Sequence, residues 1–138
     1  MIKLVIFDLD GVLIDSRELH YEALNAALRV VGEQYVITRE EHLSIYDGLN
    51  TTKKLKMLSE KKGLPAEFYD QIWNDKQKAT FELIPNAHYN TQVVFAMSVL
   101  RTRGWKIAVA SNSIRETVKI ALQSCSAMQF VDYFVSNE

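Results

Sequence analysis

The sequence predicts an α/β protein, with a parallel sheet and a block of helices inserted into it. Short apolar runs at residues 2–7, 105–110 and 133–135 have the length and composition of buried strands. Helical patterns separate the last two runs, and strand–helix–strand alternation is typical of parallel sheets with right-handed crossovers. The stretch between the first and second runs is helical for most of its length, which indicates an insertion.

The first strand, residues 2–7, is followed by a predicted helix. We expect this helix to begin at Asp15, because Glu18 three positions later completes a capping-box pattern. Gly32 is expected to end it. Between these limits, small and apolar residues recur at helical spacing: Leu19, Ala23, Ala26, Ala27, Val30 and Val31.

The helical signals continue to residue 84. Thr38 and Glu41 repeat the capping pattern, Gly63 closes a helix, and Pro65 opens the last one. The Ile84–Pro85 pair then breaks the helical pattern. The chain is therefore predicted to consist of an α/β core, residues 1–15 and 85–138, and a helical insertion, residues 16–84.

The second half of the core follows in regular order. Apolar residues stripe a helix that ends at Gly104, and residues 105–110 form the second strand. A further helix is expected over residues 114–124, and the third strand over residues 133–135.

Composition limits the classes of function. With 16 basic and 17 acidic residues the net charge is −1, so we expect neither nucleic acid nor an anionic membrane as a partner. Cys125 is the sole cysteine, which excludes an internal disulfide and fits a reducing, cytoplasmic compartment. Asp8 and Asp10 interrupt the N-terminal apolar run, so a signal peptide or membrane span is not expected.

Polar residues follow two of the predicted strands directly. Asp8, Asp10 and Gly11 come after the first, and Ser111 and Asn112 come after the second. The carboxyl ends of parallel strands meet at one edge of a sheet, which is where open α/β sheets bind their ligands. We therefore expect these residues to form one active site.

This arrangement resembles the haloacid dehalogenase superfamily, with its Rossmann-like core. The resemblance implies a Mg²⁺-dependent phosphatase in which Asp8 attacks phosphorus and forms an aspartyl-phosphate. It implies that Asp10 is the general acid and base. It also assigns phosphate binding to Ser111 and Asn112, with Gly11 at the turn beside the phosphate. The implied metal ligands are the Asp8 side chain and the Asp10 backbone carbonyl.

Within the superfamily, the sequence resembles the phosphoglycolate phosphatase and β-phosphoglucomutase branch. That branch implies a helical cap and a small phosphorylated metabolite as substrate. By this resemblance His20, Gly48 and Asn50 are the candidate substrate residues of the cap. A phosphomutase activity stays open as the alternative, and His20 is also explained as an ordinary polar residue of an amphipathic helix.

Two further elements of the superfamily, a Lys after the third strand and an acidic pair after the fourth, have no counterpart before Glu138. We therefore expect a core truncated at its C-terminus. A catalytically incomplete fragment that serves as a binding or assembly module is the rival interpretation. The first strand is then expected at the sheet edge, where unpaired backbone groups favour a homodimer or other assembly.

Overall fold

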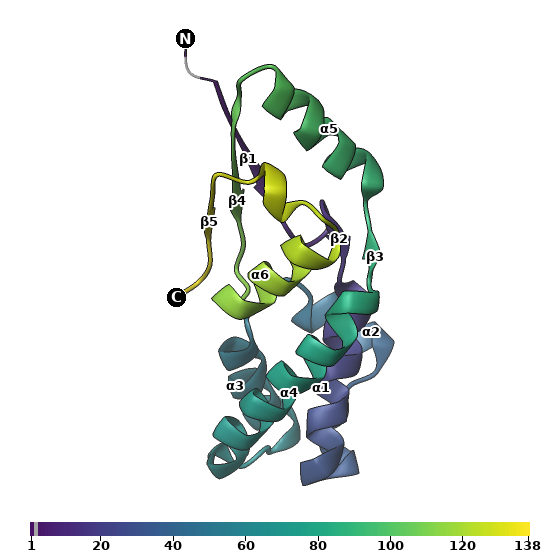
Figure 1. Cartoon of the computed structure of the whole chain (residues 1–138). Helices are drawn as coiled ribbons and strands as arrows, with labels where there is room; N and C mark the ends of the chain where they lie inside the picture. Colours follow the sequence, from purple (N-terminus) through teal and green to yellow (C-terminus); the bar gives the residue numbers. More distant parts are fainter. Residues whose placement is uncertain (2) are drawn as a thin grey trace. The chain divides into compact units, whose positions relative to one another are not determined.

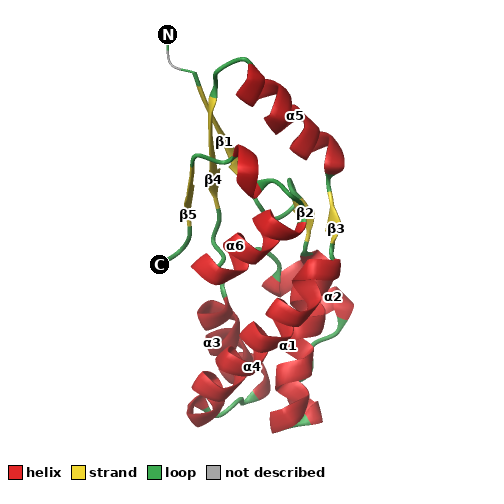
Figure 2. Cartoon of the chain, in the orientation of Figure 1, coloured by secondary structure: helices red, strands yellow, loops and turns green. Residues whose placement is uncertain are grey.

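The computed structural model describes residues 1 and 3–138; Ile2, the first residue of the predicted first strand, lies outside the described residues. The chain forms two compact units. The sheet unit comprises Met1–Ser16 and Ile84–Glu138, and the helical unit comprises Arg17–Leu83. Figure 1 follows the chain through both units, and Figure 2 separates strands from helices.

The sheet unit contains the predicted parallel sheet. Its strands are β1 (Leu4–Asp8), β4 (Lys106–Ala110) and β5 (Tyr133–Val135), in the order β1–β4–β5. Both pairs are parallel, and the register places Asp8 beside Ala110 and Ala110 beside Val135. The α/β prediction is therefore confirmed. As expected, β1 lies at one end of this order, with β4 as its neighbour among the described strands.

Two helices connect these strands. Helix α5 (Thr91–Thr102) precedes β4, and α6 (Arg115–Ser124) lies between β4 and β5, followed by a 3₁₀ turn, Met128–Phe130. Ile107 and Val109 of β4 are fully buried. The other buried apolar residues of this unit are Leu9, Leu13, Ile14, Ile84, Met97, Val118, Ala121, Leu122 and Ala127.

A small antiparallel pair was not predicted. Strand β2 (Ile14–Asp15) pairs with β3 (His88–Tyr89), and two residues are too few to show alternation in a sequence. Asp15 therefore belongs to a strand, and the prediction that it begins the first helix was wrong. Helix α1 begins at Arg17 instead.

The helical unit contains α1 (Arg17–Val31), α2 (Arg39–Glu41), α3 (Thr51–Lys62) and α4 (Tyr69–Leu83). Short 3₁₀ turns cover Glu33–Tyr35 and Ala66–Phe68, and a third, Ile84–Asn86, follows in the sheet unit. A π-helical turn, His42–Tyr46, continues α2 and was not predicted. Helices α1 and α4 pack against each other. The core of this unit consists of Leu24, Ala27, Leu28, Ile37, Tyr46, Leu55, Leu58, Leu64 and Ile72.

The predicted capping residues explain where these helices begin and end. The Thr38 side chain accepts from the Glu41 N–H while Glu41 accepts from the Thr38 N–H, which is the complete capping box. Gly63 ends α3 in the left-handed conformation, with φ of 68°.

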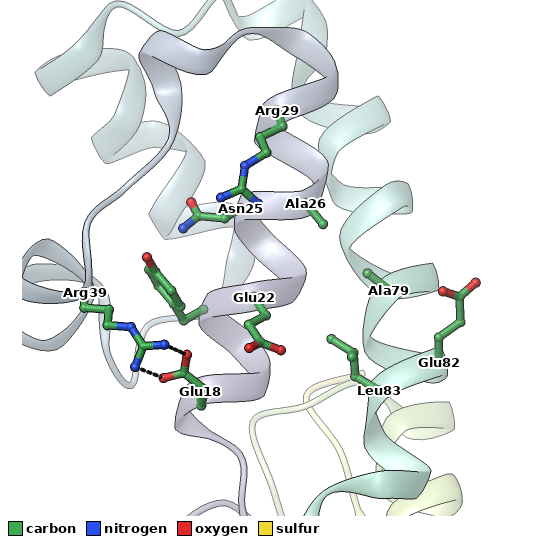
Figure 3. A pocket seen from close by; sticks show the side chains of 10 residues that line it. Glu18, Glu22, Asn25, Ala26, Arg29, Arg39, Ala79, Glu82 and Leu83 are labelled. Atoms are coloured by element: carbon green, nitrogen blue, oxygen red, sulfur yellow. Dashed lines mark hydrogen bonds and ion pairs between the residues drawn. The ribbon is translucent and has the colours of Figure 1, made fainter.

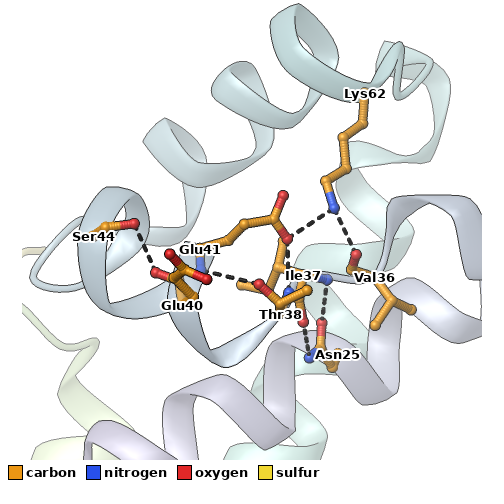
Figure 4. Close-up of polar contacts among 8 residues, drawn as sticks. All are labelled: Asn25, Val36, Ile37, Thr38, Glu40, Glu41, Ser44 and Lys62. Carbon is orange, nitrogen blue, oxygen red and sulfur yellow. Dashed lines mark hydrogen bonds and ion pairs between the residues drawn. The ribbon is translucent and has the colours of Figure 1, made fainter.

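The segment before α2 is held by side chains from two other helices. Asn25 of α1 donates to the Ile37 carbonyl and accepts from the Ile37 N–H (Figure 4). Lys62 donates to the Val36 carbonyl at 2.7 Å.

None of the described helices combines the length and the apolar character that spanning a membrane requires.

Candidate active site

The site is built at the carboxyl end of β1. Asp8 is the last residue of this strand, and its side chain is exposed. The N–H of Leu9 donates to Asp8 Oδ1 at 2.7 Å, which fixes the orientation of the carboxylate. Asp8 lies beside Ala110, the last residue of β4. Ser111 follows Ala110 directly, so the ends of the two strands bring Asp8 and Ser111 to the same edge of the sheet.

A tight turn follows Asp8. The Leu9 carbonyl accepts from the N–H groups of Leu13 and Ile14 at 3.0 and 3.1 Å. Gly11 has φ of 80°, a conformation that residues with a Cβ rarely adopt, and its N–H donates to the Ile14 carbonyl at 2.8 Å. No atom lies within 4 Å of the position that a Cβ would occupy. The backbone conformation rather than space therefore explains glycine here.

The Asp10 carboxylate accepts hydrogen bonds from serine hydroxyl groups in two parts of the chain. Its Oδ2 accepts from Ser111 Oγ at 3.4 Å and from Ser113 Oγ at 3.3 Å, and its Oδ1 accepts from the buried Ser16. Residues more than a hundred positions apart thus meet at one carboxylate, as the sheet topology predicted.

Hydrogen bonds hold both the backbone and the side chain of Ser111. Its N–H donates to the Val135 carbonyl at 3.1 Å, and its Oγ accepts from the Ser113 N–H at 3.0 Å. Asn112 between them is exposed. The site therefore brings together Asp8, Asp10, Gly11 and Ser111. Sequence reasoning missed Ser16 and Ser113, although both are hydroxyl residues close to a predicted site residue.

The candidate substrate residues belong to the helical unit. His20 is half-buried on α1. Gly48 has φ of 73°, and its N–H donates to Asp47 Oδ1 at 3.1 Å. Asn50 is the N-cap of α3, and its side chain accepts from the Lys53 N–H at 2.9 Å. A structural role therefore already accounts for Asn50.

A polar cluster beside these residues was also missed. Buried His42, on the π-helical turn, contacts the Arg17 carbonyl through Nε2 at 3.1 Å. Burial and the nearby positive charge of Lys54 lower the pKa of His42. Arg17 also pairs with Asp47 at 3.1 Å, joining the start of α1 to the loop that contains Gly48.

A hollow of about 500 Å³ lies elsewhere in the helical unit, between α1 and α4 (Figure 3). Its walls include Glu22 and Arg29 of α1 and Glu82 of α4, and an ion pair between Arg39 and Glu18 at 2.6 Å lies at one side. None of the predicted site residues lines it.

The model of the haloacid dehalogenase-like hydrolases matches residues 5–138. The chain belongs to this family. The phosphoglycolate phosphatase of Aquifex aeolicus (strain VF5) is 24% identical over 146 residues, covering 99% of this chain and 61% of that protein. The chain thus spans about three fifths of the length of this curated relative.

Solved structures of haloacid dehalogenase type share the fold. CbbY from Rhodobacter sphaeroides, in complex with xylulose-1,5-bisphosphate, superposes with a TM-score of 0.86 at 19% identity. That match covers 99% of this chain and 64% of CbbY. A predicted phosphoglycolate phosphatase from Haemophilus somnus gives 0.86 at 18% identity, covering 99% and 63%. A putative β-phosphoglucomutase from Thermotoga maritima gives 0.70 at 24%, covering 99% and 62%.

The metal that this family implies can be tested against the donors present. Asp8 and Asp10 supply carboxylate oxygens, which are the hard donors that Mg²⁺ prefers. Among residues 1 and 3–138, no group of three or more His, Cys, Asp or Glu side chains could hold a metal ion. Mg²⁺ often binds through one or two carboxylates and keeps several waters, so the residues present fit this ion.

Proposed function

We propose that the protein is a Mg²⁺-dependent phosphohydrolase that acts on a small phosphorylated metabolite through an aspartyl-phosphate on Asp8. The observation that carries the proposal is the meeting of Asp8, Asp10 and Ser111 at the carboxyl edge of the sheet. The relative from Aquifex aeolicus, a phosphoglycolate phosphatase, supports the reaction class.

The residues divide the reaction into two displacements. The exposed Asp8 carboxylate attacks phosphorus, and a P–O bond forms as the bond to the leaving oxygen breaks. Asp10 gives its proton to that oxygen, and then takes a proton from the water that attacks the phosphoenzyme; the bond between the Asp8 oxygen and phosphorus breaks, and inorganic phosphate leaves. The Asn112 amide donates to the phosphoryl oxygens, and the Ser111 hydroxyl does so when its single proton turns from Asp10 toward the substrate.

Mg²⁺, held by the Asp8 side chain and the Asp10 backbone carbonyl, would neutralise negative charge between the carboxylate and the phosphate. We further propose that residues of the helical unit, including His20, Gly48 and Asn50, act as a cap over the substrate and exclude water, as lids do. The near-neutral charge and the single Cys125 support a cytoplasmic location.

The test is hydrolysis of a generic aryl phosphate with Mg²⁺. Asp8→Asn should abolish turnover, and Asp10→Asn should lower it by about 10²–10⁴-fold, the usual share of general acid–base catalysis. Equal rates in the wild type and Asp8→Asn would disprove the nucleophile assignment. Transfer of the phosphoryl group between positions of a sugar phosphate would instead identify a phosphomutase.

A binding or assembly module is the second candidate. The observation in its favour is that the described residues provide no third acidic side chain at a metal site. Binding of inorganic phosphate by a protein that shows no hydrolysis above the Asp8→Asn background would support it.

A further inference from the structure

Three residues of the helical unit contact one another in a closed cycle. His42 Nε2 lies 3.1 Å from the Arg17 carbonyl, and the His42 carbonyl accepts from the Asp47 N–H at 2.7 Å. Asp47 Oδ2 pairs with Arg17 Nε at 3.1 Å, and Asp47 Oδ1 accepts from the Gly48 N–H. We call the contacts among Arg17, His42 and Asp47 the latch. The latch joins the first residue of the helical unit to the loop that contains Gly48.

The Arg17 carbonyl determines which nitrogen of His42 carries the proton. A carbonyl oxygen only accepts, so the proton is on Nε2 and the lone pair is on Nδ1. His42 is 3% exposed, and none of the described residues hydrogen-bonds to its Nδ1. The Tyr21 ring packs beside the imidazole, with 5.5 Å between centroids, and the Arg39 guanidinium lies over the same tyrosine. A second proton, on Nδ1, is therefore buried without an acceptor, which is unfavourable.

The groups around His42 set the direction in which it responds to pH. Burial, and after it the positive charge of Lys54 on α3, lower the pKa of His42 below its ordinary value of 6.5. His20 on α1 acts in the same direction, while Asp47 and the Arg17 carbonyl act in the opposite one. A group with a lowered pKa binds fewer protons in the closed state than in an open one. Opening is therefore favoured as the pH falls below 6.5.

We propose that His42 is a pH-sensitive switch: neutral His42 holds the Gly48 loop to the start of α1, and protonation of His42 releases the loop. The ion pair of the latch cannot hold the loop alone. The Arg17 and Asp47 side chains are 63% and 36% exposed, and exposed ion pairs contribute little. His42 begins a π-helical turn, a rare conformation that is frequent at functional sites.

The effect on catalysis rests on the proposed function, in which Gly48 and Asn50 belong to the cap over the substrate. Molecules with a released loop bind substrate poorly, so the apparent KM rises as the latched fraction falls. His42 is a positioning residue in this scheme, because its effect on the substrate passes through the loop.

The first test is structural and requires no activity. NMR of the whole chain should show His42 as the Nε2–H tautomer at neutral pH. Hydrogen exchange, corrected for the intrinsic effect of pH, should show about tenfold less protection of the Asp47, Gly48 and Leu49 N–H groups at about pH 5 than at about pH 7.5. The strand Lys106–Ala110 is the internal reference and should keep its protection.

The second test uses variants of His42. His42→Gln keeps an N–H donor but cannot gain a proton, so the loop should stay protected at both pH values. His42→Phe keeps an aromatic ring beside Tyr21 but has no donor, so the loop should exchange fast at both. His88→Gln removes an exposed histidine and is the matched control, which should behave as the wild type.

The third test measures KM for the aryl phosphate in the same pH range. Relative to His42→Gln, KM of the wild type should rise about tenfold when about one tenth of the molecules remain latched. An Nδ1–H tautomer at neutral pH, a wild-type loop with constant protection, or a His42→Gln loop that is released like that of the wild type would overturn the switch. A KM that does not follow the release would overturn its effect on substrate binding. Release of the loop in a protein without hydrolysis would support the switch and count against the proposed function alone.

Discussion

At the scale of single residues, the position of the Asp10 carboxylate depends on the serine hydroxyl groups that donate hydrogen bonds to it. Ser113 has two roles there, since its Oγ donates to Asp10 and its N–H donates to Ser111 Oγ. Ser113 therefore links the proposed acid to the proposed phosphate-binding hydroxyl. It is a positioning residue in this scheme, because its effect on the substrate passes through Asp10 and Ser111.

Ser113→Ala should lower kcat by about tenfold, the loss expected when one stabilising hydrogen bond to a charged group is removed. Ser113→Thr, which keeps the hydroxyl, should recover most of the rate. Steady-state kinetics with the aryl phosphate measures both, and Ser98→Ala, which removes an exposed hydroxyl of α5, is the control. A Ser113→Thr variant as slow as Ser113→Ala would show that the hydroxyl is not what matters.

Asp132 joins three elements of the sheet unit. Its carboxylate accepts from the Ile107 N–H at 3.0 Å, from Arg101 at 2.6 Å and from Lys106 at 3.2 Å. The hydrogen bond from Ile107, followed by that from Arg101, lowers the pKa of Asp132 far below its ordinary value of 3.8. A group with a depressed folded-state pKa stabilises the fold above its unfolded pKa and loses this contribution as the pH falls toward the folded value.

Asp132→Asn should therefore lower Tm at neutral pH. The difference from the wild type should shrink as the pH falls below 3.8, where the unfolded carboxyl is already protonated. Thermal unfolding followed at several pH values measures this, with Glu60→Gln on the exposed surface of α3 as the control. A difference that stays constant from neutral to acid pH would contradict the assignment.

At the scale of elements, capping decides where the short helices of the helical unit begin. Asn50 closes the first turn of α3 through its side chain. We expect Asn50→Ala to lower the free energy of unfolding by about 1 kcal/mol, and Asn50→Asp to keep it, because aspartate is also a good N-cap. Denaturant unfolding measures this, and Thr52→Ala in the same turn is the control. If Asn50→Ala altered only KM and not stability, its role would lie with the substrate.

At the scale of the whole molecule, the chain passes twice between the two units, after Ser16 and after Leu83. We expect limited proteolysis to cut first near these two connections or in the loop at Gly48, because segments that join two compact units open locally at lower cost than the core of either unit. Mass spectrometry of the first fragments identifies the sites. Primary cleavage within Lys106–Ala110 would contradict a division into two units.

The sequence alone determined the α/β class, the strand Tyr133–Val135, the Thr38–Glu41 capping box and the pairing of the Asp8 and Ser111 strand ends. These follow from local periodicity, from side chains that bond to nearby backbone, and from the fixed handedness of parallel crossovers. Each depends on a few adjacent residues or on a general topological rule.

Only the tertiary structure decided the features that depend on contacts between distant residues. The strand pair of Ile14–Asp15 with His88–Tyr89 is too short to show a pattern in the sequence. Because Asp15 belongs to this pair, α1 begins at Arg17 and not at Asp15 as predicted. The convergence of Ser16, Ser111 and Ser113 on Asp10 depends on where separate loops are held. These serines form no periodic pattern in the sequence, so only the fold shows which serine hydroxyls donate to the Asp10 carboxylate.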